Sequence, residues 1–281
     1  RWTVFAAAVL GMVILGVMLW YGWIQLDPRA LAARTAGLIV GVGVAYFVWA
    51  AVEIHFAGRA TGVAGIELRR LGVIAVLFGA SALFWSGFEQ VGSSLSLFAE
   101  RFTDRVVFGW QVPAGWFQSV NALFVIMLAP LMAGLWTAWD RRGGAPGLAA
   151  KVAWSLVLLG LGFLVAAWAA RRADGVGVVG PIWLIAVYFI HTVGELCLSP
   201  VGLSAVTKLA PERLAGQMMG VWFVGSALGN VLAGMLAGEV VGEGVGLMAE
   251  KFLEVVRTAG VASLCLFVLV KPLNRWMGGV R

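Results

Sequence analysis

The sequence predicts an all-α membrane protein with eight transmembrane helices. The chain is 61% hydrophobic and only 12% charged, whereas a soluble domain is about half apolar and about a quarter charged. Its charged residues divide the chain into eight apolar spans, and a transmembrane helix needs about 20 mostly apolar residues. No span alternates polar and apolar side chains over about ten residues, which is the pattern of membrane barrel strands.

This composition excludes a soluble enzyme, a disordered protein and a nucleic-acid module. The 38 glycines and 14 tryptophans are typical of membrane helices and their interfacial belts. We interpret the formal charge of +6 as loops that face a negative membrane surface. Cys197 and Cys265 are isolated thiols in apolar stretches, so they indicate neither a disulfide framework nor a metal site. We therefore expect no cofactor, no enzymatic activity and no nucleic-acid partner.

Each span is bounded by charged or turn-forming residues. In chain order the spans are Thr3–Leu26, Thr35–Val52, Leu71 to about Phe98, Val112–Trp139, Val152–Ala170, Val178–Val206, Leu214–Val241 and the weaker Leu253–Val270. The first is longer than the 7–15 residues of a signal-peptide core, and no small-residue cleavage site follows it. Since the sequence begins at Arg1 without an initiator Met, we expect a processed chain or a fragment of a longer protein.

The basic residues of the loops predict the orientation. The side that holds both termini carries 12 Lys and Arg residues, and the other side carries 8. Because cytoplasmic loops carry the excess of Lys and Arg, both termini are expected in the cytoplasm. The acidic loop with Glu239 and Glu243 then faces outward.

Two carboxylates lie deep within apolar spans, Glu89 in the third and Glu195 in the sixth. A charge at mid-membrane costs at least about 2.5 kcal/mol, so such residues usually face a cavity and carry function. The alternative for each is a protonated Glu that is hydrogen-bonded inside the bundle. Two of them on separate helices favour a polar cavity and a proton-coupled site.

The neighbours of these carboxylates lie one helical turn away. Trp85 precedes Glu89 by four residues, and His191 and Ser199 flank Glu195 at the same spacing. Pro200 follows and frees backbone groups for a bend. A metal site would need a third ligand, and no H-E-x-x-H pattern occurs, so His191 is interpreted as a packing residue.

The seventh span contains the pattern G-x-x-x-G three times, at Gly216–Gly220, Gly225–Gly229 and Gly234–Gly238. Small residues at this spacing let membrane helices approach closely. Polar and aromatic residues recur on two helices, and with the two Glu residues they predict a lined cavity: Trp222, Ser226 and Asn230 on the seventh span, Gln118 and Asn121 on the fourth. Taken alone, each of these side chains is better explained by a hydrogen bond between helices than by a contact with a ligand.

Four segments resemble the proton-dependent oligopeptide transporters of the major facilitator superfamily. FWSGFEQVGSSLSLFAERFTD at Phe84–Asp104 is similar to their helix 7, and VPAGWFQSVNALFVIMLAPLMAGLW at Val112–Trp136 is similar to helix 8. HTVGELCLSPVGLSAVTKLAP at His191–Pro211 is similar to helix 10, and GQMMGVWFVGSALGN at Gly216–Asn230 is similar to helix 11. The resemblance covers about Leu71–Val270, and the first two spans resemble the extra helix hairpin of bacterial members.

The resemblance implies a transporter fragment. Residues 1–56 correspond to the linker hairpin and residues 57–281 to the C-terminal six-helix half. The family's N-terminal half, with its E-x-x-E-R motif, is absent from this sequence. Because the substrate cavity of such transporters forms between two repeats, the missing six-helix half is an expected partner.

The resemblance also implies roles for individual residues. Glu195 matches the acid that binds the free amino group of the peptide, and Asn121 matches the amide that contacts the peptide backbone or carboxylate. Glu89 matches the acid that pairs with an Arg of the N-terminal half in the outward gate. Trp85 and Trp222 match aromatic residues that form the walls of the pockets for the peptide side chains. Ser226 matches a residue near the peptide.

The function implied is proton-coupled symport of di- and tripeptides by alternating access, in the inner membrane of a bacterium. The expected partners are these peptides, protons and the lipid bilayer. Three alternatives remain: a relative that moves a non-peptide anion such as nitrate, a membrane fragment without transport activity, and a membrane-embedded enzyme with Glu89 and Glu195 as acid and base. A carboxylate such as Glu195 offers nothing to an anion that has no amino group, and no nucleophile or metal pattern supports the enzyme.

Overall fold

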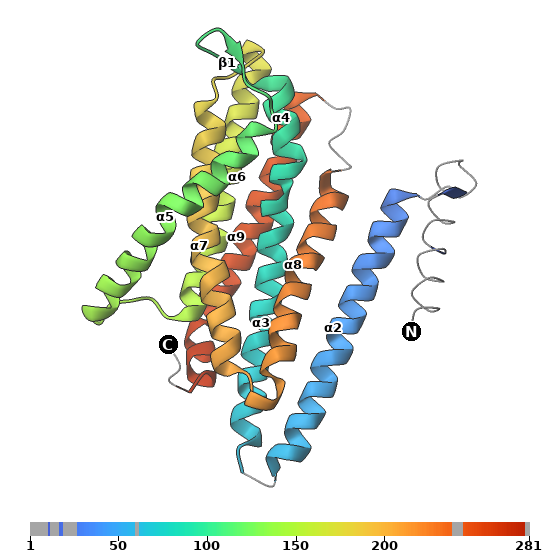
Figure 1. The fold of residues 1–281 in the computed structure, drawn as a ribbon, viewed down its shortest axis with the longest axis vertical. Coiled ribbons are helices and arrows are strands. Elements are labelled where there is room, and N and C mark those ends of the chain that lie inside the picture. The colour runs from blue at the N-terminus through green and yellow to red at the C-terminus, as the bar shows by residue number, and fades with distance from the viewer. Residues whose placement is uncertain (1–10, 12–16, 19–26, 60–61, 238–243, 279–281) are drawn as a thin grey trace.

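The computed structural model describes residues 27–59, 62–237 and 244–278, with the isolated positions 11, 17 and 18. In this part of the chain, seven helices are long and apolar enough to cross a membrane, and most of them run side by side in one elongated bundle (Figure 1). The prediction of a helical membrane protein is confirmed. The first predicted span, Thr3–Leu26, falls outside the described residues except at these isolated positions.

The elements in chain order are α2 (Pro28–Arg59), α3 (Ala64–Phe88), the 3₁₀ helix η1 (Glu89–Gly92), α4 (Ser94–Phe102), β1 (Val106–Val107), β2 (Trp110–Gln111), α5 (Trp116–Arg141), α6 (Leu148–Val176), α7 (Ile182–Leu209), the 3₁₀ helix η2 (Glu212–Leu214), α8 (Ala215–Ala237) and α9 (Val245–Trp276). Helices α2, α6 and α9 extend beyond their predicted spans at both ends, whereas α5, α7 and α8 begin inside theirs. For the three longer helices, hydropathy marks only the apolar middle, because helix ends reach into the polar interface, where charged side chains are tolerated.

Helices α2 and α9 illustrate this difference. α2 begins at Pro28, directly after Asp27, whose carboxylate accepts a hydrogen bond from the Arg29 amide at 2.9 Å; proline is favoured in the first helical turn. α9 begins eight residues before the predicted Leu253, because its charged residues pair on the helix surface instead of ending it. One such pair is Lys251 with Glu254 at 3.3 Å.

The third predicted helix is not continuous, which corrects the expectation of one helix from Leu71 to about Phe98. Regular α-helix ends at Phe88, and residues Glu89–Gly92 form a 3₁₀ turn. Ser93 has the irregular angles φ −130° and ψ −92°, after which α4 begins. A 3₁₀ stretch inside a helix often marks a functional hinge, and this one begins at the half-buried acid Glu89.

A short β-hairpin precedes α5, which the sequence interpretation missed. β1 and β2 are antiparallel, with Val107 opposite Trp110. Phe108 and Gly109 both have positive φ, 51° and 78°, as two-residue hairpin turns require. The fourth helix was predicted to begin at Val112, directly after this hairpin, whereas α5 begins at Trp116.

The core lies around α6, which packs most extensively on α9 and α7, while α8 packs on α3. Of the G-x-x-x-G pairs, Gly225–Gly229 makes the contact: a methyl group on Gly229 would lie 2.5 Å from Trp85 Cβ and 2.8 Å from the Ala82 carbonyl oxygen. A methyl group on Gly216, Gly220 or Gly234 would have no neighbouring atom within 4 Å. Gly238 lies outside the described residues. The predicted close approach is therefore confirmed at one pair.

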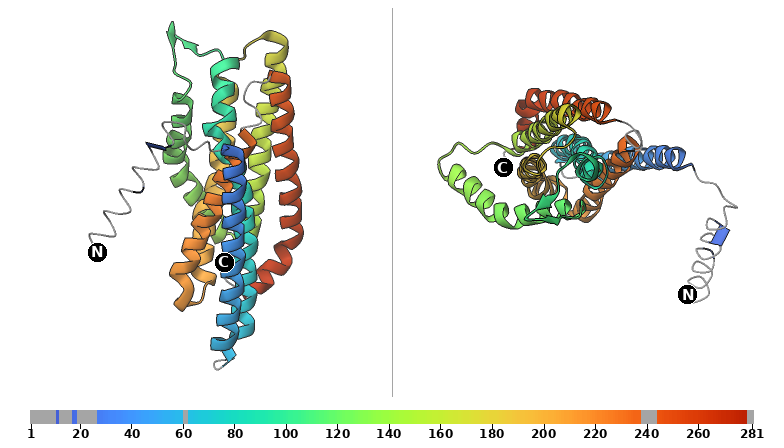
Figure 2. Two further views of the ribbon diagram at one scale, coloured as in Figure 1. Left: turned by 90° about the vertical axis from the view of Figure 1, so that its right-hand side faces the viewer. Right: turned by 90° about the horizontal axis from the view of Figure 1, so that it is seen from above.

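Helix α5 is attached differently from the others. Phe117 is its one buried residue, and the helix leans away from the bundle toward the end where it meets α6 (Figure 1). Viewed from above, α5 and α2 lie at opposite edges of the bundle (Figure 2). The space that α5 leaves beside α7 contains the site described next.

Candidate functional site

The carboxylate of Glu195 lies near the middle of α7 and is half-buried. Asn121 of α5 donates from Nδ2 to Glu195 Oε2 at 3.1 Å and lies 3.0 Å from Thr192 Oγ1. The Thr192 hydroxyl donates to the Tyr188 carbonyl oxygen at 2.7 Å. No Lys or Arg forms an ion pair with Glu195 among the described residues, so this carboxylate has one amide donor and no cation. A cationic group of a ligand would complete its surroundings.

Glu89 occupies the break between α3 and α4. Its side chain is half-buried, and no hydrogen bond or ion pair reaches its carboxylate in the part of the chain that the structure describes. Trp85 and Phe88, on the turn before it, pack edge to face with ring centroids 5.2 Å apart. A half-buried acid without a cation costs free energy unless it is protonated or paired from outside this chain segment.

The aromatic residues predicted to line side-chain pockets lie mainly in packing positions. Trp222 is only 5% exposed, and its indole covers Gly202 of α7, where a larger side chain would collide with the ring. The Trp85 indole nitrogen is buried without a hydrogen-bond partner, and Ser226 is half-buried on α8. The Trp222 side chain therefore faces α7 and does not line an open cavity among the described residues.

His191 is fully buried and takes part in the core. Its Nε2 lies 3.2 Å from the Leu159 carbonyl oxygen, and its ring packs against Phe163 with centroids 5.0 Å apart. Gly162 leaves the room that the imidazole fills. No three His, Cys, Asp or Glu side chains gather as candidate metal ligands among the residues searched, which are the described ones.

A cavity of about 960 Å³ opens between α5 and α7, and Glu195 lies in its wall. The cavity continues along α7 past Ser199 and Ser204, and its far end is lined by polar groups that the sequence interpretation did not assign to a site: Trp136, Asp140, Lys151, Lys208 and Asn274. Of the predicted site residues, only Glu195 lines this cavity; Asn121 reaches it through its hydrogen bond. The basic residues were interpreted as loop charges, and no local pattern distinguishes a lysine that faces a cavity from one that faces solvent.

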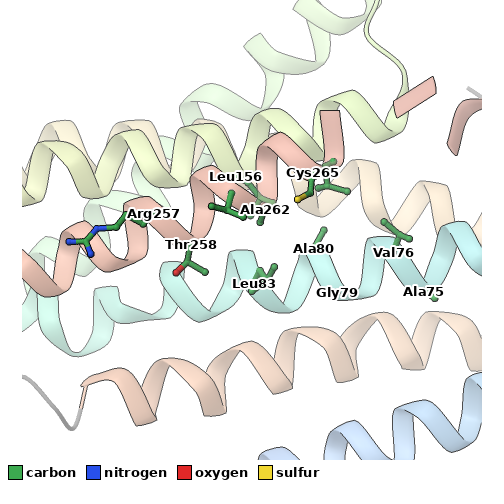
Figure 3. Close-up of a pocket in the computed structure, with 12 residues that line it drawn as sticks. Ala75, Val76, Gly79, Ala80, Leu83, Leu156, Arg257, Thr258, Ala262 and Cys265 are labelled. Atoms are coloured by element: carbon green, nitrogen blue, oxygen red, sulfur yellow. The ribbon is translucent and has the colours of Figure 1, made fainter. Parts of the chain in front are cut away.

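A second groove, of about 680 Å³, lies between α3 and α9 (Figure 3). Its walls are almost wholly apolar, with Ala75, Gly79, Leu83 and Val261 among them and Arg257 and Thr258 as polar members. It contains no carboxylate and none of the predicted site residues. The α5–α7 cavity differs from this groove because it presents both acidic and basic groups to a ligand.

Comparison with known proteins agrees with this arrangement. The sequence profile of the POT family matches residues 44–246, which is most of the chain. The chain belongs to the POT family. The peptide transporter YePEPT of Yersinia enterocolitica is 34% identical to this POT chain over 283 residues, covering 100% of the chain and 54% of the relative. The dipeptide and tripeptide permease A of Pectobacterium carotovorum is 31% identical over 201 residues, covering 70% of the chain and 39% of that protein.

Solved structures place the fold in the same family. A crystal structure of a peptide transporter POT in complex with sulfate superimposes with a TM-score of 0.80 and 33% sequence identity, covering 98% of this chain and 53% of that one. This POT chain thus spans about half the length of the relatives it matches.

Proposed function

We propose that this chain is the C-terminal part of a transporter that couples the movement of di- and tripeptides to protons by alternating access. The observation that carries the proposal is Glu195, a half-buried carboxylate of an apolar helix with an amide donor and an adjoining cavity. No Lys or Arg of the described residues forms an ion pair with it. The free amino group of a peptide is the cation that this site lacks. Membership of the POT family supports the same substrate class, since the similar proteins are named as peptide transporters.

The architecture that accompanies this proposal has eight membrane helices. The linker hairpin consists of the first span and α2, and the six-helix half begins with α3. Since α2 continues to Arg59, we place the end of the hairpin at the turn before Ala64, a few residues beyond position 56. A second six-helix half completes the substrate cavity, and the protein lies in the inner membrane of a bacterium with the termini of this segment in the cytoplasm.

Glu195 holds the peptide amine in this proposal, and Asn121 both orients that carboxylate and contacts the peptide. Trp85, Trp222 and Ser226 contribute to the pockets for the peptide side chains. For Trp222 this requires α8 to shift relative to α7, because its indole is buried against Gly202. Glu89 pairs with a cation of the other half, and its protonation biases the outward gate between two states.

Uptake by the full-length protein in proteoliposomes tests the assignment of Glu195. We expect a dipeptide to accumulate under an inward proton gradient and Glu195→Gln to lower dipeptide affinity ten- to hundredfold, because a hydrogen bond to a charged group contributes about 1.5–3 kcal/mol. Acetylation of the peptide's amino group should weaken wild-type binding to the same degree and cause no further loss in the variant. Transport of nitrate in place of peptide, or unchanged dipeptide binding by Glu195→Gln, would contradict the assignment.

A second pair of assays tests the coupling role of Glu89. Glu89→Gln mimics the protonated acid, so uphill uptake driven by a proton gradient should be lost while exchange of labelled for unlabelled peptide continues. An acid that only stabilises the bundle predicts parallel loss or parallel retention of both activities. Intact accumulation driven by pH in Glu89→Gln would rule out the gating role.

A further inference from the structure

The cavity beside α7 has an acidic group at one end and hydrogen-bond donors further along it. Ser199 follows Glu195 by one helical turn, which is about 6 Å along the axis, and both residues line the cavity. Lys151, from the start of α6, and Trp136, from α5, line the same cavity. A dipeptide in extended form is about 7 Å long, which matches the step from Glu195 to the level of Ser199.

These donors lack acceptors within the described residues. The Trp136 indole nitrogen and the Ser199 hydroxyl are both buried without a hydrogen-bond partner. The Lys151 ammonium lies 4.5 Å from the centre of the Trp136 ring, and no carboxylate forms an ion pair with it in that part of the chain. Asp140 also lines the cavity and lies beyond ion-pair distance of Lys151. Three donors from three helices therefore share this part of the cavity with one carboxylate, Asp140, which accepts no ion pair from Lys151 among the described residues.

We propose that Lys151, Trp136 and Ser199 form a binding station for the carboxylate of the peptide, on the path between Glu195 and the end of the bundle where α5 meets α6. The inference rests on the proposed function and extends it, because it places a carboxylate site within this half of the transporter. The ammonium supplies the charge, while the indole and the hydroxyl donate hydrogen bonds. The station acts on peptide that enters or leaves through this end of the cavity.

The experiment measures KM for alanyl-alanine from each face of the membrane, with the full-length protein in proteoliposomes of known orientation. Lys151→Gln should raise KM about tenfold or more on the face where α5 meets α6, as expected for a lost charge-assisted hydrogen bond. On the opposite face, KM should change by less than about twofold, which corresponds to a negligible change in binding free energy. Lys151→Arg keeps the positive charge, although its planar guanidinium differs in shape, so it should raise KM less than Lys151→Gln does. Trp136→Phe should raise KM on the face where α5 meets α6.

Two controls separate the station from a general effect. Lys271→Gln removes a lysine that is exposed on α9 and does not line the cavity, so KM should stay at the wild-type value on both faces. Alanyl-alanine amide has no carboxylate, so Lys151→Gln should not weaken its binding further.

The outcomes distinguish the two proposals. If the wild-type protein moves alanyl-alanine and Lys151→Gln leaves KM unchanged, or changes it equally on both faces, the station is wrong and the peptide transporter stands. If the wild-type protein moves no peptide, the proposed function fails and the station falls with it. Should Lys151→Gln fail to fold, Trp136→Phe and Ser199→Ala carry the same test.

Discussion

The two sides of helix α7 are built in opposite ways. Toward α6 and α8 the packing is close: the Trp222 indole covers Gly202, and a methyl group on Gly194 would lie 3.2 Å from the Ser155 carbonyl oxygen. Toward α5 the contact is local, made through the Asn121 hydrogen bonds and the edge-to-face pair of Phe124 with Phe189, whose ring centroids lie 5.4 Å apart. The rest of α5 leaves a cavity of about 960 Å³. The close side fixes the backbone that carries Glu195, and the open side leaves its carboxylate available to a ligand.

This difference explains how one helix combines rigidity with access. Binding groups are most effective when packing holds them in place before the ligand arrives. The small residues of α7 let α6 and α8 approach its backbone. On the open side, α5 contains Pro130, which removes one backbone hydrogen bond and favours a bend. We infer that α5 is the element of this half that moves when the cavity opens or closes, with its hydrogen-bonded first turns as the pivot.

The largest effect is expected on the close side. Gly202→Leu would displace the Trp222 indole, so it should destabilise the protein about as much as loss of a buried aromatic side chain, by about 3–5 kcal/mol. The same substitution at Gly134 of α5, where nothing lies within 4 Å, should change stability by less than about 0.5 kcal/mol. Thermal unfolding of the purified full-length variants in detergent measures both. Equal destabilisation by the two substitutions would show that α5 is packed as closely as α8.

A smaller effect is expected where the two sides meet. Asn121→Leu keeps the shape of the side chain but removes its hydrogen bonds to Glu195 and Thr192, so it should cost about 1.5–3 kcal/mol, as for bonds to charged groups. Because Asn121 and Glu195 share a hydrogen bond, the double variant Asn121→Leu/Glu195→Gln should be non-additive by at least about 0.5 kcal/mol. Strict additivity in unfolding free energy would mean that this hydrogen bond is not formed in the working protein. Asn121→Leu paired with Lys271→Gln is the additive control.

Much of the fold could be predicted from the sequence, because in a membrane the length of an apolar span and the charges that bound it determine where a helix lies. Seven of the predicted spans overlap the seven long apolar helices of the described residues. The helix ends were missed because charged residues such as Glu250 continue α9 by pairing on its surface, here with Arg257 at 3.6 Å. The break at Glu89 carried a weak signal in Gly92 and the two serines after it.

The site was predictable in part. The cost of burying charge identified Glu89 and Glu195 without any knowledge of tertiary contacts. Which G-x-x-x-G pair makes the close contact, and that Trp222 lies against Gly202, depend on how helices distant in sequence meet. Lys151 shows the limit most clearly: its position near a helix start is typical of an interfacial lysine, and only the outward lean of α5 makes it part of a cavity.

The smallest effect is expected at the start of α5, where its second polar link lies. Gln118 donates from Nε2 to Ser96 Oγ at 2.8 Å, and Ser96 in turn donates to the Val91 carbonyl oxygen at 2.9 Å. These two hydrogen bonds connect α5 to the 3₁₀ break that contains Glu89.

Because Gln118 is exposed, Gln118→Ala should lower the unfolding free energy by no more than about 1 kcal/mol. If α5 pivots about its first turns, however, loss of this link should increase hydrogen exchange at the amides of Glu89–Gly92 as well as at the start of α5, because opening there depends on few contacts. Gln111→Ala, an exposed glutamine of β2, is the matched control and should leave exchange unchanged at both places. Faster exchange in α5 alone would separate the two regions and restrict the pivot to the hydrogen bond between Asn121 and Glu195.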